Sequence, residues 1–415
     1  MLTQENAKIL LRYYRTALIY LVITAGLAAI LLGFRLTGNY AELALSSIAT
    51  VHIGTLGALT LGIIGLYLRL FYKVEEIQVR EWTVKTILIL LNVGIGLLTL
   101  GFVLNTWPVL AVGFIGVGYA ILWWAIVYFR WLMQAPTTQR NGALLFGAFG
   151  TVGLVISILL GGYLFHGYLS DNTAQNMRLA HIHAGLVGWA SLGLLGIGIA
   201  LRGGDAPLLK SIQSLQWSGW VWLLGVIGLV IFMATWQLTL VLIGGGLILL
   251  AFLGYGYSMP KVGKLGTNHQ NTESVSGATR LLPYIIIGFI ALFVTILLGF
   301  DLSINYPSGR AASHRIVGVG GWLLFTFLMA LFSDIPRTVY FIRNTSSPFQ
   351  TDRLTFLYPK GMKLGWIFMS IALLVSVAGY FISLKMLLSG VFLLVLTVGL
   401  LALYILIKYR IGAAE

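Results

Sequence analysis

The chain alternates long apolar segments with short polar ones from end to end. Each apolar segment has about 20 residues, the length that an α-helix needs to cross a lipid bilayer. We therefore expect an all-α integral membrane protein with twelve transmembrane helices in a single membrane domain, residues 1–415. The predicted spans are about 17–36, 44–68, 84–104, 109–130, 142–166, 179–201, 217–235, 238–257, 281–300, 314–333, 364–384 and 386–408.

The polar links between these spans differ in length. Short links near Trp107-Pro108, Trp236-Gln237 and Lys385 predict tight turns. The longest links, 259–280 and 334–363, contain Gly, Ser, Thr, Asn and Pro, which are typical of connecting loops. We expect neither long link to carry chemistry of its own.

Basic residues concentrate on one side of the predicted membrane. Lys8, Arg12 and Arg15 precede an apolar run that is too long for the core of a cleaved signal peptide, so we expect a retained first span. With a cytoplasmic N-terminus, the C-terminus is cytoplasmic as well, and 21 of the 26 Lys and Arg residues lie in cytoplasmic segments. The five on the outer side are Arg35, Arg178, Arg310, Arg315 and Lys385.

Composition narrows the class of protein further. Hydrophobic residues make up 59% of the chain and charged residues only 9%, which excludes a soluble globular protein. The net charge of +14 follows from the basic cytoplasmic segments, so a nucleic-acid partner is unnecessary. The chain has no Cys, and histidine is therefore the only strong ligand that it offers to a transition metal.

Four of the six histidines begin predicted spans that run from outside to inside. His52 begins the second span, His181 and His183 the sixth, and His314 the tenth, so all four lie in the outer third of the membrane. His52, His183 and His314 are spaced regularly, because 183 − 52 and 314 − 183 are both 131. The spacing predicts three repeats of four spans, at about 1–135, 136–265 and 270–415, arranged as three pseudo-symmetric four-helix arcs.

The flanks of the histidines support the repeat in two registers. His52-Ile-Gly54-Thr-Leu-Gly57 matches His183-Ala-Gly185-Leu-Val-Gly188 without a gap. Gly318-Val-Gly-Gly321-Trp322 matches Gly185-Leu-Val-Gly188-Trp189 at an offset of 133, which sets His314 opposite His181 instead of His183. Gly185 and Gly188 would let a flat macrocycle approach the backbone, or they would serve the commoner purpose of helix packing.

His181 and His183 stand roughly 200° apart on a helix and point to nearly opposite faces. They therefore predict two metal centres, and imidazole is the usual protein ligand to heme iron. The alternative is neutral imidazoles bonded to carbonyl groups or water at the membrane interface. Three outer arginines would pair with heme propionates or anchor the helices, and two tryptophans would line a macrocycle or belong to the aromatic belt. These residues are Arg178, Arg310, Arg315, Trp189 and Trp322.

The run from His181 to Trp189 resembles the tenth helix of subunit I of the heme–copper oxidases, most closely the C-family cytochrome c oxidases and nitric oxide reductases. The resemblance implies twelve spans in three arcs, and two b-type hemes in the outer half. It implies that His181 holds one heme and His183 another. A cyclic shift of the three repeats pairs His183 with His314 and His181 with His52. Without the shift, His52 pairs with His183, and His314 faces His181.

Two features depart from that family. Its copper is held by three histidines, two of them adjacent, whereas here only His166 and His269 are left over, and we expect both at the surface or in a loop. Copper is therefore not expected. No carboxylate falls in the middle of a predicted span, since Asp301 and Asp334 are placed at helix ends, and proton pumping is not expected either.

The function that these observations favour is a diheme b-type cytochrome without copper. It would act in electron transfer or in oxygen or nitric oxide chemistry as an oxidoreductase, with a cytochrome, a quinol or another membrane subunit as its partner. The alternative is a non-catalytic protein of the same fold that handles or senses heme or copper, or assists assembly. We expect it in the cytoplasmic membrane of a bacterium or archaeon, with the metal sites toward the outer face.

Overall fold

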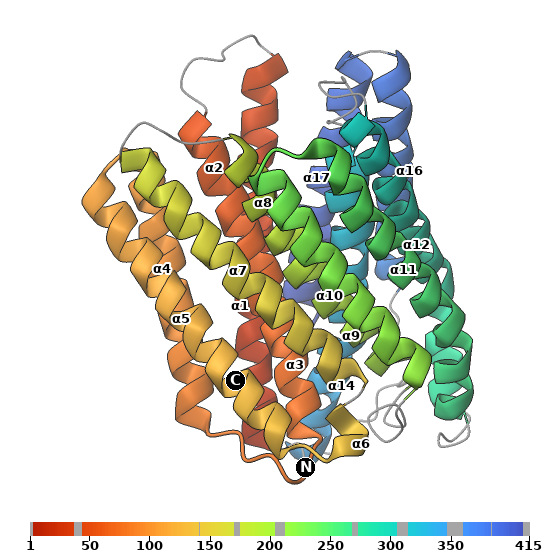
Figure 1. Ribbon diagram of the computed structural model, residues 1–415. Helices are drawn as coiled ribbons and strands as arrows, with labels where there is room; N and C mark the ends of the chain where they lie inside the picture. Colours follow the sequence, from red (N-terminus) through yellow and green to blue (C-terminus); the bar gives the residue numbers. More distant parts are fainter. Residues whose placement is uncertain are drawn as a thin grey trace. The chain divides into compact units, whose positions relative to one another are not determined.

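In the computed structural model the described part of the chain is helical and contains no strand (Figure 1). The structure describes residues 3–36, 44–140, 142–169, 175–203, 212–267, 273–304, 314–346, 360–382 and 384–409. Eleven helices among them are long and apolar enough to cross a membrane. The protein is therefore an integral membrane protein.

These eleven helices agree in position with eleven of the twelve predicted spans. The helices are longer than the predicted apolar runs: α1 begins at Gln4, well before the predicted start at 17. The predicted span 364–384 falls in α16 (Lys360–Ile382), whose described apolar stretch, Leu364–Ala378, is shorter than the other spans.

The helices divide into two compact units. Unit 1 comprises residues 1–73, 79–120 and 315–415, and unit 2 comprises residues 74–78 and 121–314. The helix α5 (Trp107–Gln134) has its first part in unit 1 and its remainder in unit 2.

Unit 1 joins the two ends of the chain. Its first helix packs against its last one, where a Cβ on Gly399 would lie 2.8 Å from Cβ of Ala25. Besides part of α5, its helices are α1 (Gln4–Leu36), α2 (Ala44–His52), η1 (Ile53–Thr60), α3 (Leu61–Tyr72), α4 (Glu81–Leu104), η4 (Ile316–Leu324), α14 (Phe325–Ser346), α16 and α17 (Leu384–Lys408).

Unit 2 contains the centre of the chain. Its helices α10 and α11 form an extensive antiparallel contact, and α7 packs against the helix that carries His181 and His183. Besides the rest of α5, its helices are α6 (Thr137–Arg140), α7 (Ala143–Leu169), α8 (Gln175–His183), η2 (Ala184–Ser191), α9 (Leu192–Gly203), α10 (Gln213–Ala234), α11 (Leu238–Thr267) and α12 (Glu273–Ile304).

Two of the predicted tight turns are present as short links. Helix α4 ends on Asn105, which adopts a left-handed conformation with φ of 50° and lets α5 begin at Trp107. Asparagine is one of the few residues other than glycine that tolerate this conformation. The second turn, between α10 and α11, places Trp236 at φ of 58°.

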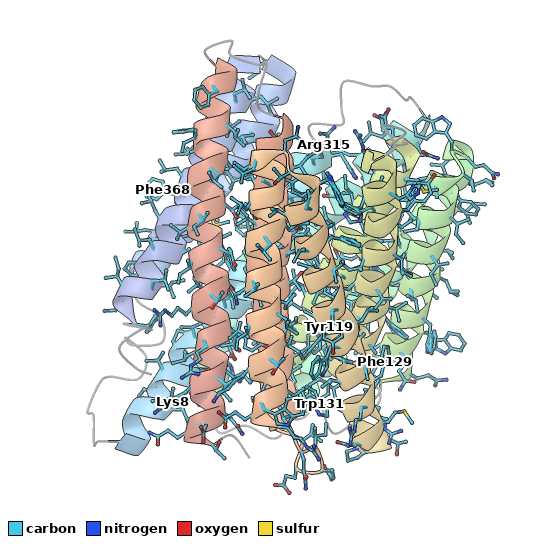
Figure 2. The ribbon with its side chains drawn as sticks, turned by 90° about the vertical axis from the view of Figure 1, so that its left-hand side faces the viewer. Lys8, Tyr119, Phe129, Trp131, Arg315 and Phe368 are labelled. Atoms are coloured by element: carbon cyan, nitrogen blue, oxygen red, sulfur yellow. The ribbon has the colours of Figure 1, made fainter. Side chains whose placement is uncertain are left out.

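Large apolar side chains cover the outward faces of the long helices. Phe368 on α16 is half exposed and points away from its unit in Figure 2, where Lys8 and Arg315 lie near opposite ends of unit 1. Ile126 on α5 and Leu374 on α16 are likewise exposed. Faces of this kind are suited to lipid acyl chains and would be unfavourable in water.

The prediction that Asp334 lies at a helix end is wrong. Helix α14 continues to Ser346, and Asp334 lies inside the span Ile316–Ile342 with 1% of its surface exposed. It forms an ion pair with Arg69 of α3 and accepts a hydrogen bond of 2.5 Å from Tyr14 of α1. The sequence showed a charge at the end of an apolar run, but a charge neutralised by a buried partner does not end a span.

The ion pair also shows that the prediction of no carboxylate inside a span is wrong for Asp334. A carboxylate does lie within a span of unit 1, although Arg69 and Tyr14 already bind it. Asp301, in contrast, lies near the end of α12, where the sequence placed it.

Candidate metal centre

Each of the three helices with candidate histidines changes from α to π geometry beside its histidine. The π segment η1 begins directly after His52 and η2 directly after His183, while η4 begins two residues after His314. A π-helix is a rare, wider turn that is found frequently at functional sites. The hydrophobic pattern did not predict these segments, because they preserve an apolar helix and alter only its winding.

His52 and His183 use their own helices to hold their imidazole rings. Nδ1 of His52 lies 2.9 Å from the carbonyl oxygen of Ile48, and Nδ1 of His183 lies 2.8 Å from that of Leu179. In both cases the acceptor stands four residues earlier in the same helix. The two histidines therefore occupy equivalent positions, as the register with an offset of 131 predicts.

His181 and His314 are held instead by the preceding membrane helix. Nδ1 of His181 lies 2.8 Å from the carbonyl oxygen of Ser157 on α7, and Nδ1 of His314 lies 2.9 Å from that of Thr295 on α12. These two histidines are equivalent to each other. The hydrogen bonds thus favour the register with an offset of 133, in which His314 stands opposite His181.

All four imidazoles consequently share one tautomer. A carbonyl oxygen can only accept a hydrogen bond, so the proton must lie on Nδ1, and the unprotonated Nε2 carries the lone pair. Metal-bound histidines in proteins show this arrangement, because the Nδ1 bond fixes the ring and makes Nε2 a stronger ligand. The same arrangement is also expected if the histidines bind no metal and are neutral imidazoles bonded to carbonyl groups at the membrane interface.

Within unit 2 the rings of His183 and His314 lie together. Their centroids are 6.2 Å apart, and their planes make an angle of 22°. A metal–imidazole bond is about 2.0 Å long and the ring centroid lies about 1.1 Å behind the bonded nitrogen, so two imidazoles on opposite sides of one metal have centroids about 6.2 Å apart. Aromatic rings in direct contact cover a similar range, about 4.5–7 Å, so the separation fits a shared metal without requiring one.

His181 and His183 have different partners, in agreement with their predicted opposite directions. The ring of His183 lies beside that of His314, whereas His181 faces α7. There Oγ of Ser157 lies 3.3 Å from Nδ1 of His181 and donates to the His181 carbonyl oxygen at 3.2 Å. Ser157 and Thr295 are thus supporting residues that the sequence pattern did not reveal, since their main-chain oxygens do the binding.

Gly185 and Gly188 face α7. A Cβ on Gly185 would lie 3.1 Å from Oγ of Ser157, and one on Gly188 would lie 3.1 Å from Cα of Gly153. Trp189 is buried beside Gly150 of the same helix, with 2% of its surface exposed. Helix packing accounts for both glycines, and their contact with a cofactor stays a prediction.

The remaining predicted residues lie in different surroundings. Arg178 on α8 and Arg315 are exposed, and Figure 2 shows Arg315 at one end of unit 1. Trp322 is buried in η4, and His166 is exposed near the end of α7. Arg310 and His269 fall outside the described residues.

His52 belongs to unit 1, where its ring lies 5.3 Å from that of Phe102. Its pairing with a histidine of unit 2 stays a prediction. Among the residues that the structure describes, no three or more His, Asp and Glu side chains are grouped so that they could hold a metal ion.

No protein-family model matches the chain, and no curated protein shows significant similarity to it.

Proposed function

We propose that this membrane protein binds heme, and that His183 and His314 would hold one heme iron. The observation that carries the proposal is their centroid separation of 6.2 Å, together with the Nδ1 bond of each ring to a main-chain carbonyl. Heme iron with two imidazole ligands is six-coordinate and supplies one-electron transfer. Electron transfer is therefore the activity that we assign to this centre.

The residues of the chain would hold and tune this centre. The carbonyl groups of Leu179 and Thr295 fix both rings and increase the electron density on Nε2. Gly299 supports the position of His314, because its missing side chain lets Cε1 of the ring approach α12: a Cβ there would lie only 3.3 Å away. Arg178 and Arg315 would supply cations for the heme propionates.

A second heme is proposed at His181. In favour of it, Nδ1 of His181 bonds to Ser157 of α7, whereas His183 lies beside His314, and the His181 imidazole carries its proton on Nδ1. If one iron kept an open position, reduction of oxygen or nitric oxide would become possible there.

Together these features support a relationship to the heme–copper oxidases and nitric oxide reductases, with the cyclic shift of the repeats. The proposal includes twelve spans, cytoplasmic termini and hemes near the outer face of a bacterial or archaeal cytoplasmic membrane. Its electron donor would be a cytochrome, a quinol or another membrane subunit.

A reduced-minus-oxidised absorption spectrum of the purified full chain tests the proposal. We expect b-type bands, and their absence would remove the cytochrome function. His183→Ala and His314→Ala should each abolish the same heme and leave the other, which His181→Ala should abolish in turn. His166→Ala serves as the control, because His166 is exposed and lies outside the proposed sites.

Carbon monoxide then separates electron transfer from gas chemistry. An unperturbed reduced spectrum would favour electron transfer, because both irons would be six-coordinate. A perturbed spectrum would show an open iron, and we would expect the perturbation to disappear in His181→Ala but not in His183→Ala.

A further inference from the structure

We propose that Thr60 and Ser191 are positioning residues, whose hydroxyl groups hold the π segments that direct His52 and His183. The inference rests on the proposed function for its relevance to heme, but its structural part concerns the apoprotein. Thr60 ends η1 and Ser191 ends η2, and the two residues are 131 apart, like the histidines.

The hydroxyl groups make a bond that matches π geometry. Oγ1 of Thr60 donates to the carbonyl oxygen of Thr55 at 2.9 Å, and Oγ of Ser191 donates to that of Leu186 at 2.9 Å. Each acceptor stands five residues back, the spacing of a π turn. Several serines and threonines in the α-helices of this protein bond four residues back, as Thr151 does to Gly147 and Ser376 to Ala372.

The winding of the segment decides where the histidine points. A π turn contains one residue more than an α turn, so conversion of the segment to α geometry would rotate the preceding residues by about 100° relative to the rest of the helix. His52 and His183 bond within their own helix and would follow that rotation. A turn of this size would move the ring of His183 away from the position beside His314.

The third π segment provides an internal comparison. Its sequence, Ile-Val-Gly-Val-Gly-Gly-Trp-Leu-Leu, contains no Ser or Thr. The histidine beside it, His314, is held by Thr295 of another helix and does not depend on the winding of its own. The two π segments whose histidine bonds to its own helix, η1 and η2, thus contain the hydroxyl group. The segment η4, whose histidine bonds to another helix, lacks it.

Both hydroxyl groups are enclosed by protein. Thr60 has 1% and Ser191 3% of its surface exposed, so water does not readily replace either donor. Removal of the hydroxyl should therefore weaken the π segment measurably. Removal of a back-bonded hydroxyl in an α segment should leave the histidines in place.

Amide hydrogen exchange on the purified full chain tests the first step. Ser191→Ala should speed exchange in the peptide that covers 184–191 about fivefold, the factor for the loss of one hydrogen bond. Ser191→Thr should retain the wild-type rate, and Ser376→Ala, the same change at a buried α-helical serine, should leave 184–191 unaffected. Unchanged exchange in Ser191→Ala would overturn the proposal.

The imidazole of His183 tests the second step without heme. In protein made without heme and labelled with nitrogen-15 histidine, Ser191→Ala should shift the imidazole resonances assigned to His183, and Ser191→Thr should restore them. Faster exchange with an unshifted resonance would assign Ser191 to helix stability and overturn its positioning role. This result does not depend on whether the wild type binds heme, so it separates the present proposal from the function proposed above.

Thr60 offers an independent repetition in unit 1. Thr60→Val keeps the shape of the side chain and removes the hydroxyl group, and it should speed exchange over 53–60 and shift the His52 imidazole. Thr60→Ser should restore both, and Thr151→Val is the matched control. If Thr60→Val and Thr151→Val behaved alike at His52, the positioning role of Thr60 would be refuted.

Discussion

The buried ion pair between Arg69 and Asp334 gives a prediction whose magnitude follows from its surroundings. The side chain of Asp334 is 2% exposed and that of Arg69 15% exposed, so neither charge is well solvated. Asp334→Asn removes one charge and leaves the other buried without its counter-ion. Loss of one partner of a buried pair costs about 3–5 kcal/mol, and we expect a loss of this size.

The double variant Arg69→Met with Asp334→Leu should recover most of that stability. Apolar side chains of similar volume remove both desolvation penalties together, and replacement of a buried pair in this way is often neutral or stabilising. The exposed pair Glu81–Lys85 provides the control. Glu81→Gln should change stability by at most about 0.5 kcal/mol, because exposed pairs one helical turn apart contribute little.

Unfolding followed by far-ultraviolet circular dichroism in detergent micelles measures all three variants. A cost below about 1 kcal/mol for Asp334→Asn would show that water solvates the pair well. A double variant as unstable as the single one would show that the pair does more than neutralise two charges. Either result would refute the reasoning.

Variants at three further positions concern the backbone of unit 1. Asn105→Gly should keep or slightly raise stability and Asn105→Ala should lower it by about 1 kcal/mol, as judged from the melting temperature, because Ala tolerates the left-handed conformation poorly. Gly62→Ala should cost about 1–3 kcal/mol, since its Cβ would overlap the ring of Phe327. Gly26→Ala, where a Cβ meets open space, should be neutral or stabilising in the same assay. A Gly62→Ala variant as stable as Gly26→Ala would contradict the close packing.

The hydrophobic pattern predicted the membrane helices well, because length and apolar character alone determine whether a segment can cross a bilayer. It predicted the end of the span before Asp334 wrongly. Hydropathy treats each charge as solvated, whereas this one is neutralised by Arg69, which is remote in the sequence. Such a pairing cannot be inferred from local composition.

At the candidate site the sequence revealed the histidines, but it did not show which of them lie close together. The spacing of His181 and His183 predicted opposite faces, and their different partners agree with it. The choice of His314 as the neighbour of His183 depends on how the helix that begins at His314 packs beside α8, which the sequence left open. The sequence did not predict the π segments. A π segment differs from an α-helix in its backbone hydrogen bonds, and the order of apolar and polar side chains does not reveal these bonds.

The union of the chain's two ends in unit 1 has a consequence for biosynthesis. Tyr14 and Asp334 are 320 residues apart, so α1 and α3 enter the membrane long before their partner α14 has been translated. During that interval Arg69, in the last turn of α3, lies at the end of its span without Asp334. The ion pair can form only when α14 has been inserted, so arrival of Asp334 would complete the packing of α3 in unit 1.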